Sequence, residues 1–361
     1  MLDISLAIAA SGRPPRVERI LPVAWLGQSA DTSCICSTHH ELNRTPFLTS
    51  LGCAIRKPSL IKTHFNSDLR AKLGVRGPLM VDSGGFALVA NPRARWMLRD
   101  VEKIIRAVEA DIFVSLDFPP TTRDTSSERR TKIIRSVESF YALSSRIDNK
   151  IIMPVVHGRR ISEIELSVKL LAREGRNFAW IGLGGIVPLL KSRRVSREIS
   201  SMGPEVFIAR ALRIIRQANP RSRIHAFGAG GTRTFPALFA FGADSADSIG
   251  WRQAAGFGSI FLPLKSQRVV KWNSKGRAPR RQLDDADIAQ LEVCVCPVCA
   301  PANSASMRIL QLQKDFYNRS IHNAWVTANQ FRYWPDTRRK MQAFISSGGL
   351  GARWMTAIEQ A

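Results

Sequence analysis

Four residues in the C-terminal quarter of the chain have the types and spacing of a metal site. Cys294, Cys296 and Cys299 form a C-x-C-x2-C run, and His322 follows 23 positions after the last of them. Three thiolates and one imidazole are the ligand set of a tetrahedral Cys3His zinc site. Such a site has no open position for water, so it stabilises a fold and does no chemistry. On spacing alone, His225 is the alternative fourth ligand.

Three carboxylates elsewhere could do chemistry instead. Asp82, Asp117 and Asp247 each lie at or near the end of an apolar run. A carboxylate at such a place is partly desolvated, and its neighbours can shift its pKa. One could act as a nucleophile and another as its acid–base partner, as in retaining sugar-bond chemistry. A single aspartate there is more often a helix N-cap or a loop acceptor, but three indicate an active site.

The elements that must position these residues follow an alternating pattern. Helical spacing of apolar residues occurs in the segments 133–141 and 161–171. Between such segments, short apolar runs suit strands that are buried on both faces. About eight repeats of this strand–helix pattern predict a (β/α)8 TIM barrel, an α/β fold. The predicted strands lie within residues 20–27, 78–85, 111–120, 151–158, 178–185, 223–231, 242–250 and 259–264.

In such a barrel, the C-terminal ends of the strands form the rim that carries the active site. The predicted strands place seven polar or glycine residues on this rim. They are Asp82, Asp117, His157, Gly184, Gly185, Gly228 and Asp247.

The charge of the chain points to a polyanionic partner. The 361 residues include 53 Lys and Arg against 29 Asp and Glu, a net charge of +24. So positive a field attracts nucleic acid first. No basic amphipathic helix stands out, which makes a membrane surface a weaker candidate. The N-terminus makes a poor signal peptide and no apolar run is long enough to span a bilayer, so we expect a cytoplasmic protein.

The composition changes after residue 264. Residues 265–281 contain seven Lys or Arg and no acid, and we interpret them as an exposed basic insertion. Its Arg268, Lys271, Lys275 and Arg277 are candidate contacts to nucleic acid, although a solvated linker is the commoner fate of such a run. We therefore expect a catalytic barrel over residues 1–290. A zinc-binding subdomain with C-terminal helices would cover residues 291–361, its helical tail running from about 305 to 347.

The six cysteines are too few for a disulfide scaffold in a chain of this length. Cys34 and Cys36 form a second C-x-C, with His39 and His40 nearby. We interpret this segment as a surface loop rather than a second metal site.

Several segments together resemble the tRNA-guanine transglycosylase superfamily. Their order along the chain is the family order, and they extend from residue 81 to residue 325, which makes the resemblance far more specific than any single motif. The segments are VDSGGFALV (81–89), SLDFPP (115–120), LGGIV (183–187), AFGAG (226–230), GADSADSIGWR (242–252), and CVCPVC (294–299) with SIHNAW (320–325).

The resemblance implies a reaction and roles for its catalytic residues. Members exchange a guanine in nucleic acid for a 7-deazaguanine without breaking the backbone. By position, Asp247 would be the nucleophile that attacks C1′ of the target nucleotide. Asp82 would assist proton transfer to the departing base and from the incoming one. The target nucleotide must leave the base stack to react, and a concave rim suits a flipped base.

The resemblance also implies which residues bind the base. Asp117 would accept from the guanine N1–H and N2–H2 edge, and the backbone N–H of Gly185 in the Gly184–Gly185 loop would donate to O6. Phe86 and Phe227 would stack on the base, although either could be ordinary core. The match also favours His322 over His225 as the fourth metal ligand.

Departures from the family pattern narrow the implied substrate. His157-Gly158 stands where queuine-pathway enzymes have Gln-Gly, and a histidine can still offer the base one donor or acceptor. Pro188, Leu189 and Leu190 stand where bacterial tRNA enzymes hold a glutamate that is associated with an aminomethyl group. The incoming base would then be the neutral 7-cyano-7-deazaguanine, preQ0.

The polymer and the further partners follow from the same departures. Trp251 and Arg252 replace a Pro-Thr-Arg segment that helps bacterial enzymes hold the anticodon loop, and they become candidate nucleic-acid contacts here. We also expect no room for the RNA-binding domain of archaeal members.

These features resemble the DNA-directed (DpdA-type) branch, found in bacterial modification–restriction clusters and phages. DNA is therefore the favoured partner and tRNA the alternative, with a non-catalytic nucleic-acid-binding homologue as a third interpretation. A helicase or other ATPase and a second copy of the chain are further expected partners.

Overall fold

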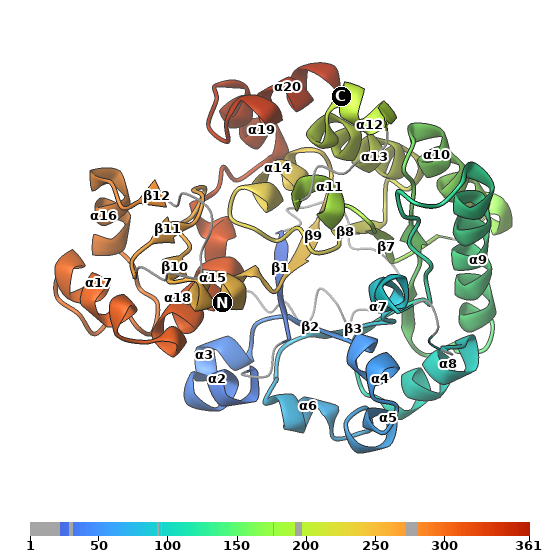
Figure 1. The fold of residues 1–361 in the computed structure, drawn as a ribbon, viewed down its shortest axis with the longest axis horizontal. Helices are drawn as coiled ribbons and strands as arrows, with labels where there is room; N and C mark the ends of the chain where they lie inside the picture. The colour runs from blue at the N-terminus through green and yellow to red at the C-terminus, as the bar shows by residue number, and fades with distance from the viewer. Residues whose placement is uncertain are drawn as a thin grey trace.

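A closed ring of parallel strands surrounded by helices forms the main body of the protein (Figure 1). The computed structural model describes residues 22–28, 32–91, 94, 96–175, 177–191, 197–271 and 281–361. All strand pairs of the ring are parallel. The strands are β1 (Val23–Gly27), β2 (Phe47–Ser50), β3 (Leu79–Asp82), β4 (Ile112–Val114), β5 (Ile151–Met153), β6 (Val155–Val156), β7 (Trp180–Leu183), β8 (Arg223–Ala226) and β9 (Ser245–Ser248).

The ring closes through β5 and β6. The strand order runs β5-β4-β3-β2-β1-β9-β8-β7-β6, so these two strands stand at opposite ends of it. In the chain, however, only Pro154 separates them, and proline cannot donate a ladder hydrogen bond. The two segments are therefore one strand that pairs with β4 through its first part and with β7 through its second. The predicted (β/α)8 barrel is confirmed: it has eight strands when β5 and β6 are counted as one.

One strand of the barrel differs from the prediction. The strand between β1 and β3 is β2, Phe47–Ser50, which was not among the predicted strands. The predicted run 259–264 instead contributes β10 (Ser259–Ile260) to a separate three-stranded sheet. The other seven predicted runs each contain a strand of the barrel.

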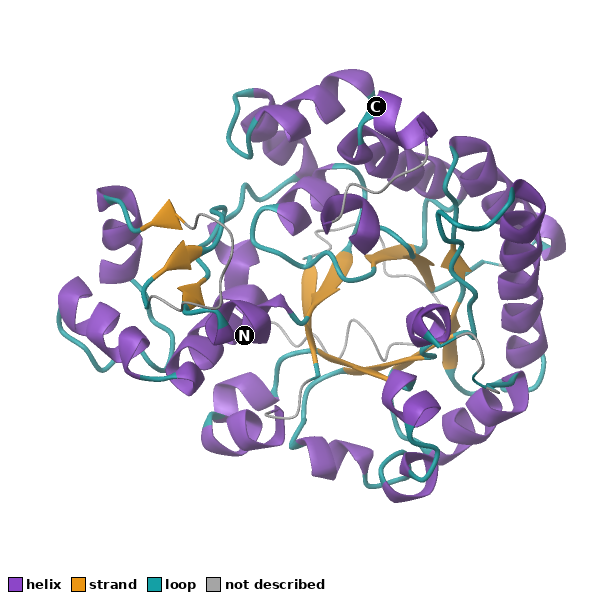
Figure 2. Ribbon diagram, in the orientation of Figure 1, coloured by secondary structure: helices purple, strands orange, loops and turns teal. Residues whose placement is uncertain are grey.

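Helices form the outer layer of the barrel (Figure 2). The predicted helical segments 133–141 and 161–171 lie within α9 and α10, and their apolar residues face the core. No helix in the part of the chain that the structure describes is long and apolar enough to span a membrane. Along the barrel, the helices are α2 (Thr32–Thr38), α3 (His40–Asn43), α4 (Gly52–Arg56), α5 (Leu60–Thr63), α6 (Leu69–Leu73), α7 (Gly85–Ala90), α8 (Leu98–Ala107), α9 (Ser126–Ser144), α10 (Ile161–Leu171), η1 (Ala172–Glu174), α11 (Val187–Lys191), α12 (Arg197–Met202), α13 (Pro204–Ala218), α14 (Thr234–Ala240) and α15 (Gly250–Gly256).

The interior of the barrel is packed with apolar side chains. Trp25 and Trp180 meet edge to face with ring centroids 6.4 Å apart, and both are buried. Met80, Ile112 and Met153 belong to the same cluster. Because these residues fill the centre, the polar residues at the C-terminal ends of the strands lie above a packed apolar interior.

A smaller unit adjoins the barrel next to β1 (Figure 1). It contains the sheet β10–β11–β12, whose last two strands are Arg268–Val269 and Arg281–Gln282. The helices α16 (Asp285–Glu292), α17 (Ala305–Lys314) and α18 (Phe316–Asn329) complete it. The predicted basic insertion is thus part of a small sheet over the residues described here.

The last helices pack elsewhere. After η2 (Gln330–Tyr333), α19 (Arg338–Ser346) packs on α14 and α20 (Ala352–Gln360) packs on α13, both on the outside of the barrel. The domain boundary at residues 290/291 stays a prediction. The strands β10, β11 and β12 all precede it in sequence, and α16 crosses it.

Candidate active site and metal centre

Three aspartates gather at the C-terminal rim of the barrel, as the strand ends predict. Asp82 is the last residue of β3, Asp117 follows β4 by three residues, and Asp247 lies in β9. Asp117 and Asp247 both act electrostatically on Asp82, so the three carboxylates share one neighbourhood.

Asp247 is held in a fixed orientation. Its Oδ1 accepts a hydrogen bond of 2.5 Å from the backbone N–H of Gly228, and His225 Nε2 lies 3.2 Å from the same oxygen. The carbonyl of Asp247 also accepts from the N–H of Gly230. The side chain is 13% exposed, so a small part of it remains open to solvent. An anchored, partly desolvated carboxylate with an open side is suited to nucleophilic attack.

Asp82 has an environment that favours its protonated form. Its Oδ2 accepts 2.6 Å and 3.3 Å hydrogen bonds from Ser50 Oγ and the Gly84 N–H. Burial raises the pKa of Asp82 from 3.8 to about 7, with further upward contributions from the charges of Asp117 and Asp247, against the lowering effect of the hydrogen bond from Ser50. A carboxyl group with a pKa near neutrality can both give and take a proton.

The raised pKa predicts a pH-dependent cost in stability. Between pH 3.8 and about 7 the folded protein binds the Asp82 proton more tightly than the unfolded chain, so this group lowers stability as pH rises through that range. Asp82→Asn removes the charge, and its melting temperature relative to wild type is expected to be higher at about pH 8 than at about pH 5. Asp148→Asn, at an exposed position, is the control. An equal effect of Asp82→Asn at both pH values would contradict the raised pKa.

Asp117 and His157 form a buried pair beside Asp82. The His157 Nε2 and Asp117 Oδ2 atoms are 2.7 Å apart, and Ser83 Oγ donates to Asp117 Oδ1 at 3.0 Å. Gly85 allows this arrangement, because a Cβ there would lie 2.0 Å from Asp117 Oδ1. Each Asp117 oxygen still has a lone pair for a ligand.

The other ring nitrogen of His157 has no partner among the described residues. Its Nδ1 is buried and makes no hydrogen bond there. It faces the Gly184–Gly185 loop, where a Cβ on Gly184 would be 2.8 Å from it and one on Gly185 3.8 Å. Gly185 has φ +74°, a conformation that glycine adopts without strain. A buried polar atom without a partner beside a glycine loop indicates a place for a polar ligand.

The two predicted stacking residues differ in their surroundings. Phe86 at the start of α7 is 63% exposed, which is unusual for a phenylalanine and leaves its ring open to a planar ligand. Phe227 is half-buried, packs edge to face on His225 with centroids 4.5 Å apart, and lies close over Gly182. Stacking on a base stays a prediction for both.

Two residues that support the carboxylates were not predicted as site residues. Ser50 ends the strand that the prediction missed, and it pairs with Asp82 across β2 and β3. His225 was considered only as a metal ligand, but it lies between Ser245 Oγ, at 2.8 Å, and Asp247. It lies two residues before Phe227 in an extended segment, so the two side chains lie on the same side, and this alternation was the available clue.

The predicted metal ligands form one buried cluster. The ligand atoms of Cys294, Cys296, Cys299 and His322 all lie within 4.8 Å of one another. The three sulfur atoms are 3.8, 3.3 and 3.6 Å from His322 Nδ1. Tetrahedral zinc requires about 3.6 Å between such sulfur and nitrogen atoms. The residues therefore fit a tetrahedral metal ion, and His322, not His225, is the fourth member.

A second layer of contacts fixes the histidine. His322 Nε2 lies 2.9 Å from the carbonyl oxygen of Phe261, which leaves Nδ1 directed at the sulfurs. The neighbouring Asn323 accepts from the Phe261 N–H and donates to the carbonyls of Trp251 and Ser259. The I-H-N segment therefore joins α18 to the end of the barrel as well as to the cluster.

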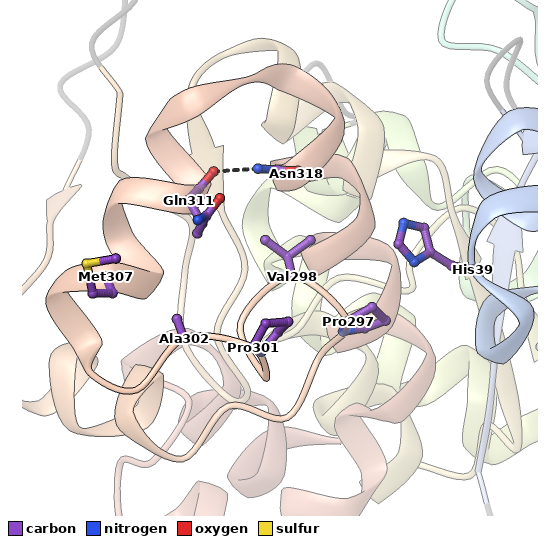
Figure 3. A pocket seen from close by; sticks show the side chains of 8 residues that line it. All are labelled: His39, Pro297, Val298, Pro301, Ala302, Met307, Gln311 and Asn318. Atoms are coloured by element: carbon purple, nitrogen blue, oxygen red, sulfur yellow. Dashed lines mark hydrogen bonds between the residues drawn. The ribbon is translucent and has the colours of Figure 1, made fainter.

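The segment around Cys34 is helical rather than a loop. Cys34 and Cys36 lie in α2, where Cys36 is buried and burial raises its pKa to about 12. His39 faces Pro297 and Val298 across a pocket of about 300 Å3 (Figure 3). Within the described ranges, the Cys3His cluster is the one group of three or more such side chains that could hold a metal.

The structure corrects two of the predicted contacts to nucleic acid. Trp251 is 1% exposed, and its Nε1 donates to the Gly27 carbonyl. Arg268 is 3% exposed and forms an ion pair with Asp287. Neither side chain can reach a polyanion from these positions.

The other predicted contacts stay open. Arg252 is partly exposed, with its guanidinium 5.3 Å from the Phe316 ring, and Lys271 is exposed. Lys275 and Arg277 lie outside the described residues.

The fold and the site together define a class: a TIM barrel with three aspartates on its rim and a Cys3His cluster beside it. The model of the family described as "Queuine tRNA-ribosyltransferase" matches residues 54–337, and the chain belongs to this family.

Archaeal relatives are about a quarter identical to the chain over the aligned residues. A tRNA-guanine(15) transglycosylase of Methanosarcina mazei is 25% identical over 287 residues, which cover 79% of this chain and 52% of the relative. Proteins of the same name from Pyrococcus abyssi and Thermococcus kodakarensis are 24% and 23% identical, over 70% and 88% of this chain and 39% and 50% of the relatives. The chain thus spans about half the length of the curated relatives it matches.

Proposed function

We propose that this protein is a guanine transglycosylase that exchanges a guanine in nucleic acid for a 7-deazaguanine. The observation that carries the proposal is that two carboxyl groups on one rim of the barrel have contrasting environments. Asp247 is anchored by Gly228 and stays partly open, whereas Asp82 has a pKa raised to about 7. Two carboxyl groups in contrasting environments are the arrangement that separates a nucleophile from an acid–base group.

The proposed reaction has two displacement steps at C1′ of the target nucleotide. In the first, an oxygen of Asp247 bonds to C1′, the C1′–N9 bond breaks, and protonated Asp82 gives its proton to the departing guanine. In the second, Asp82 takes the N9 proton of the incoming base, N9 bonds to C1′, and the Asp247 ester bond breaks. No phosphodiester bond changes, and both carboxyl groups return to their initial states.

Base recognition would use the groups beside these carboxylates. Asp117 would accept from the N1–H and N2–H2 edge, and the N–H of Gly185 would donate to O6. His157 would offer its unpartnered Nδ1 to the same base, while Asp117 holds Nε2. Phe86 and Phe227 would stack on the ring, an interaction worth about 1–3 kcal/mol per base.

Two polymers are candidates for the substrate. We favour DNA, with preQ0 as the incoming base, because of His157 and the Pro188–Leu190 segment, which depart from the tRNA enzymes. The printed names of the archaeal relatives support tRNA as the second candidate. The net charge of +24 suits either polymer.

The Cys3His cluster would hold a structural zinc ion through Cys294, Cys296, Cys299 and His322. Bound there, zinc would stabilise the unit that carries α18 and would take no part in the exchange. A duplex-opening ATPase and a second copy of the chain stay predicted partners.

The polymer can be tested directly. The purified protein is incubated with labelled guanine or labelled preQ0 and either duplex DNA, single-stranded DNA or tRNA. We expect incorporation into DNA and a preference for preQ0, because no acid follows the Gly184–Gly185 loop to attract an amine. Label that enters tRNA and never DNA would replace the first candidate by the second, and no label in any polymer would contradict the transglycosylase itself.

A further inference from the structure

A cavity opens at the same end of the barrel as the carboxylates. It has a volume of about 550 Å3 and lies between α7, the segment after β4 and the first turns of α9. Because α7 follows β3 and residues 118–124 follow β4, the cavity lies at the C-terminal ends of the strands, where Asp82 and Asp117 also lie. Its lining includes Gly85, Trp96, Phe118, Arg123, Lys132 and Arg135.

The cavity is separated from the base site by little more than one glycine. Gly85 lines the cavity, yet its Cα is so close to Asp117 that a Cβ would lie 2.0 Å from the carboxylate. The next residue, Phe86, is 63% exposed at the same turn. A strand that places one base over Asp117 would therefore bring its neighbouring nucleotide to this cavity.

Two aromatic side chains in the lining are held in place. Trp96 Nε1 donates a 3.1 Å hydrogen bond to the carbonyl of Ser83, the residue after Asp82. At Phe118 the backbone N–H donates to Ser136 Oγ at 2.9 Å, which positions the residue from which the ring extends. The Arg135 guanidinium lies 4.0 Å from the centroid of the Phe118 ring. Fixed aromatic rings beside an arginine are the means by which proteins hold unstacked bases.

The cavity lining contains more cationic side chains than carboxylates. Its one carboxylate, Asp124, is already matched by Lys132 Nζ at 2.6 Å and by the Thr121 N–H at 2.6 Å. Arg123 and Arg135 are exposed and form no ion pair with any carboxylate in the described ranges. Guanidinium groups in this state are suited to phosphate, which they bind in bidentate fashion.

We propose that this cavity binds the nucleotide next to the exchanged one in the same strand, with its base against Trp96 and Phe118 and its phosphate on Arg123 and Arg135. The proposal rests on the proposed function, because it needs a polynucleotide whose reacting base lies over Asp117.

The test compares two double variants with equal loss of charge. Arg123→Gln with Arg135→Gln alters the cavity. Arg173→Gln with Arg221→Gln is the control, because these exposed arginines precede β7 and β8 and so lie at the opposite end of the barrel. Each protein is titrated with a labelled single-stranded oligonucleotide over a series of KCl concentrations, and its KM for the free base is measured. Arg123→Gln alone, at an exposed side chain, guards against misfolding.

The cavity variant is expected to weaken oligonucleotide binding about tenfold. It should also reduce the salt slope by about 0.7 for each phosphate that the protein no longer neutralises. The KM for the free base should stay unchanged. Equal binding and equal salt slopes in the cavity and control variants would overturn the proposal.

Two further outcomes separate the cavity from the exchange reaction. If wild type neither binds nor modifies any polymer, the proposed function fails instead. Displacement of the oligonucleotide by free guanosine monophosphate, dependent on Arg123, would also overturn the proposal, since the cavity would then be a site for a free nucleotide.

Discussion

Asp247→Asn is expected to abolish base exchange, with a loss of at least about 10⁴-fold in rate. The amide has the same shape, and its Oδ1 can still accept from the Gly228 N–H. It is a far weaker nucleophile, however, so no ester to C1′ can form. The measurement is incorporation of labelled guanine into the polymer that wild type modifies.

Binding separates this loss from misfolding. Asp247→Asn should bind the oligonucleotide nearly as well as wild type, because the cations that bind phosphate are unchanged. Asp148→Asn, at an exposed aspartate that precedes β5 and so lies toward the end of the barrel opposite the rim, should retain full activity. Exchange by Asp247→Asn at a rate near that of wild type would mean that another group attacks C1′.

Cys296→Ser is expected to cause the largest loss of stability. Cys296 is fully buried, and its sulfur is nearest to His322 Nδ1, at 3.3 Å. Without it a tetrahedral ion loses one of four ligands, and structural zinc contributes roughly 10–16 kcal/mol of binding free energy in small zinc domains. We expect metal content to fall from one zinc per chain toward none, with a lower melting temperature.

Cys34→Ser provides the matched control, because it makes the same substitution at an exposed cysteine outside the cluster. That variant should keep its metal and its melting temperature. The account of the cluster would be refuted by a Cys296→Ser protein that is metal-free, as stable as wild type and fully active. Chelation of wild type should reproduce the effect of the substitution, since both would remove the ion that the cluster is proposed to hold through His322 of α18.

The sequence predicts the barrel well because most of its strands are continuous apolar runs between helical segments. The exception, Phe47–Ser50, contains only two apolar residues. Its Thr49 is polar but buried, and its hydroxyl donates a hydrogen bond to Gln28 Oε1. Residues 259–264 are as apolar as the strands of the barrel, but for another reason. Phe261 and Leu262 are buried in the same core cluster as the three cysteines. Apolar content predicts burial there, but it does not say against which sheet.

The same limit applies to the residues of the site: some could be predicted from the sequence and others could not. The three aspartates and the metal ligands could be predicted because their position relative to strands or their spacing carries the information. The support that His225 and Ser50 give to Asp247 and Asp82 arises between strands, and no local pattern shows it. Arg268 was mistaken for a free cation because its partner, Asp287, lies 19 residues further along the chain.

The measurement closest to the central claim is peptide mapping by mass spectrometry after an acid quench of wild type with its polymer and no incoming base. The account predicts the polymer attached to the peptide that contains Asp247, through C1′ of one sugar that has lost its guanine. This adduct should have an intact phosphodiester backbone and should be absent in Asp247→Asn. An adduct on Asp82 or on any other residue, or exchange with no adduct and a cut strand, would contradict it.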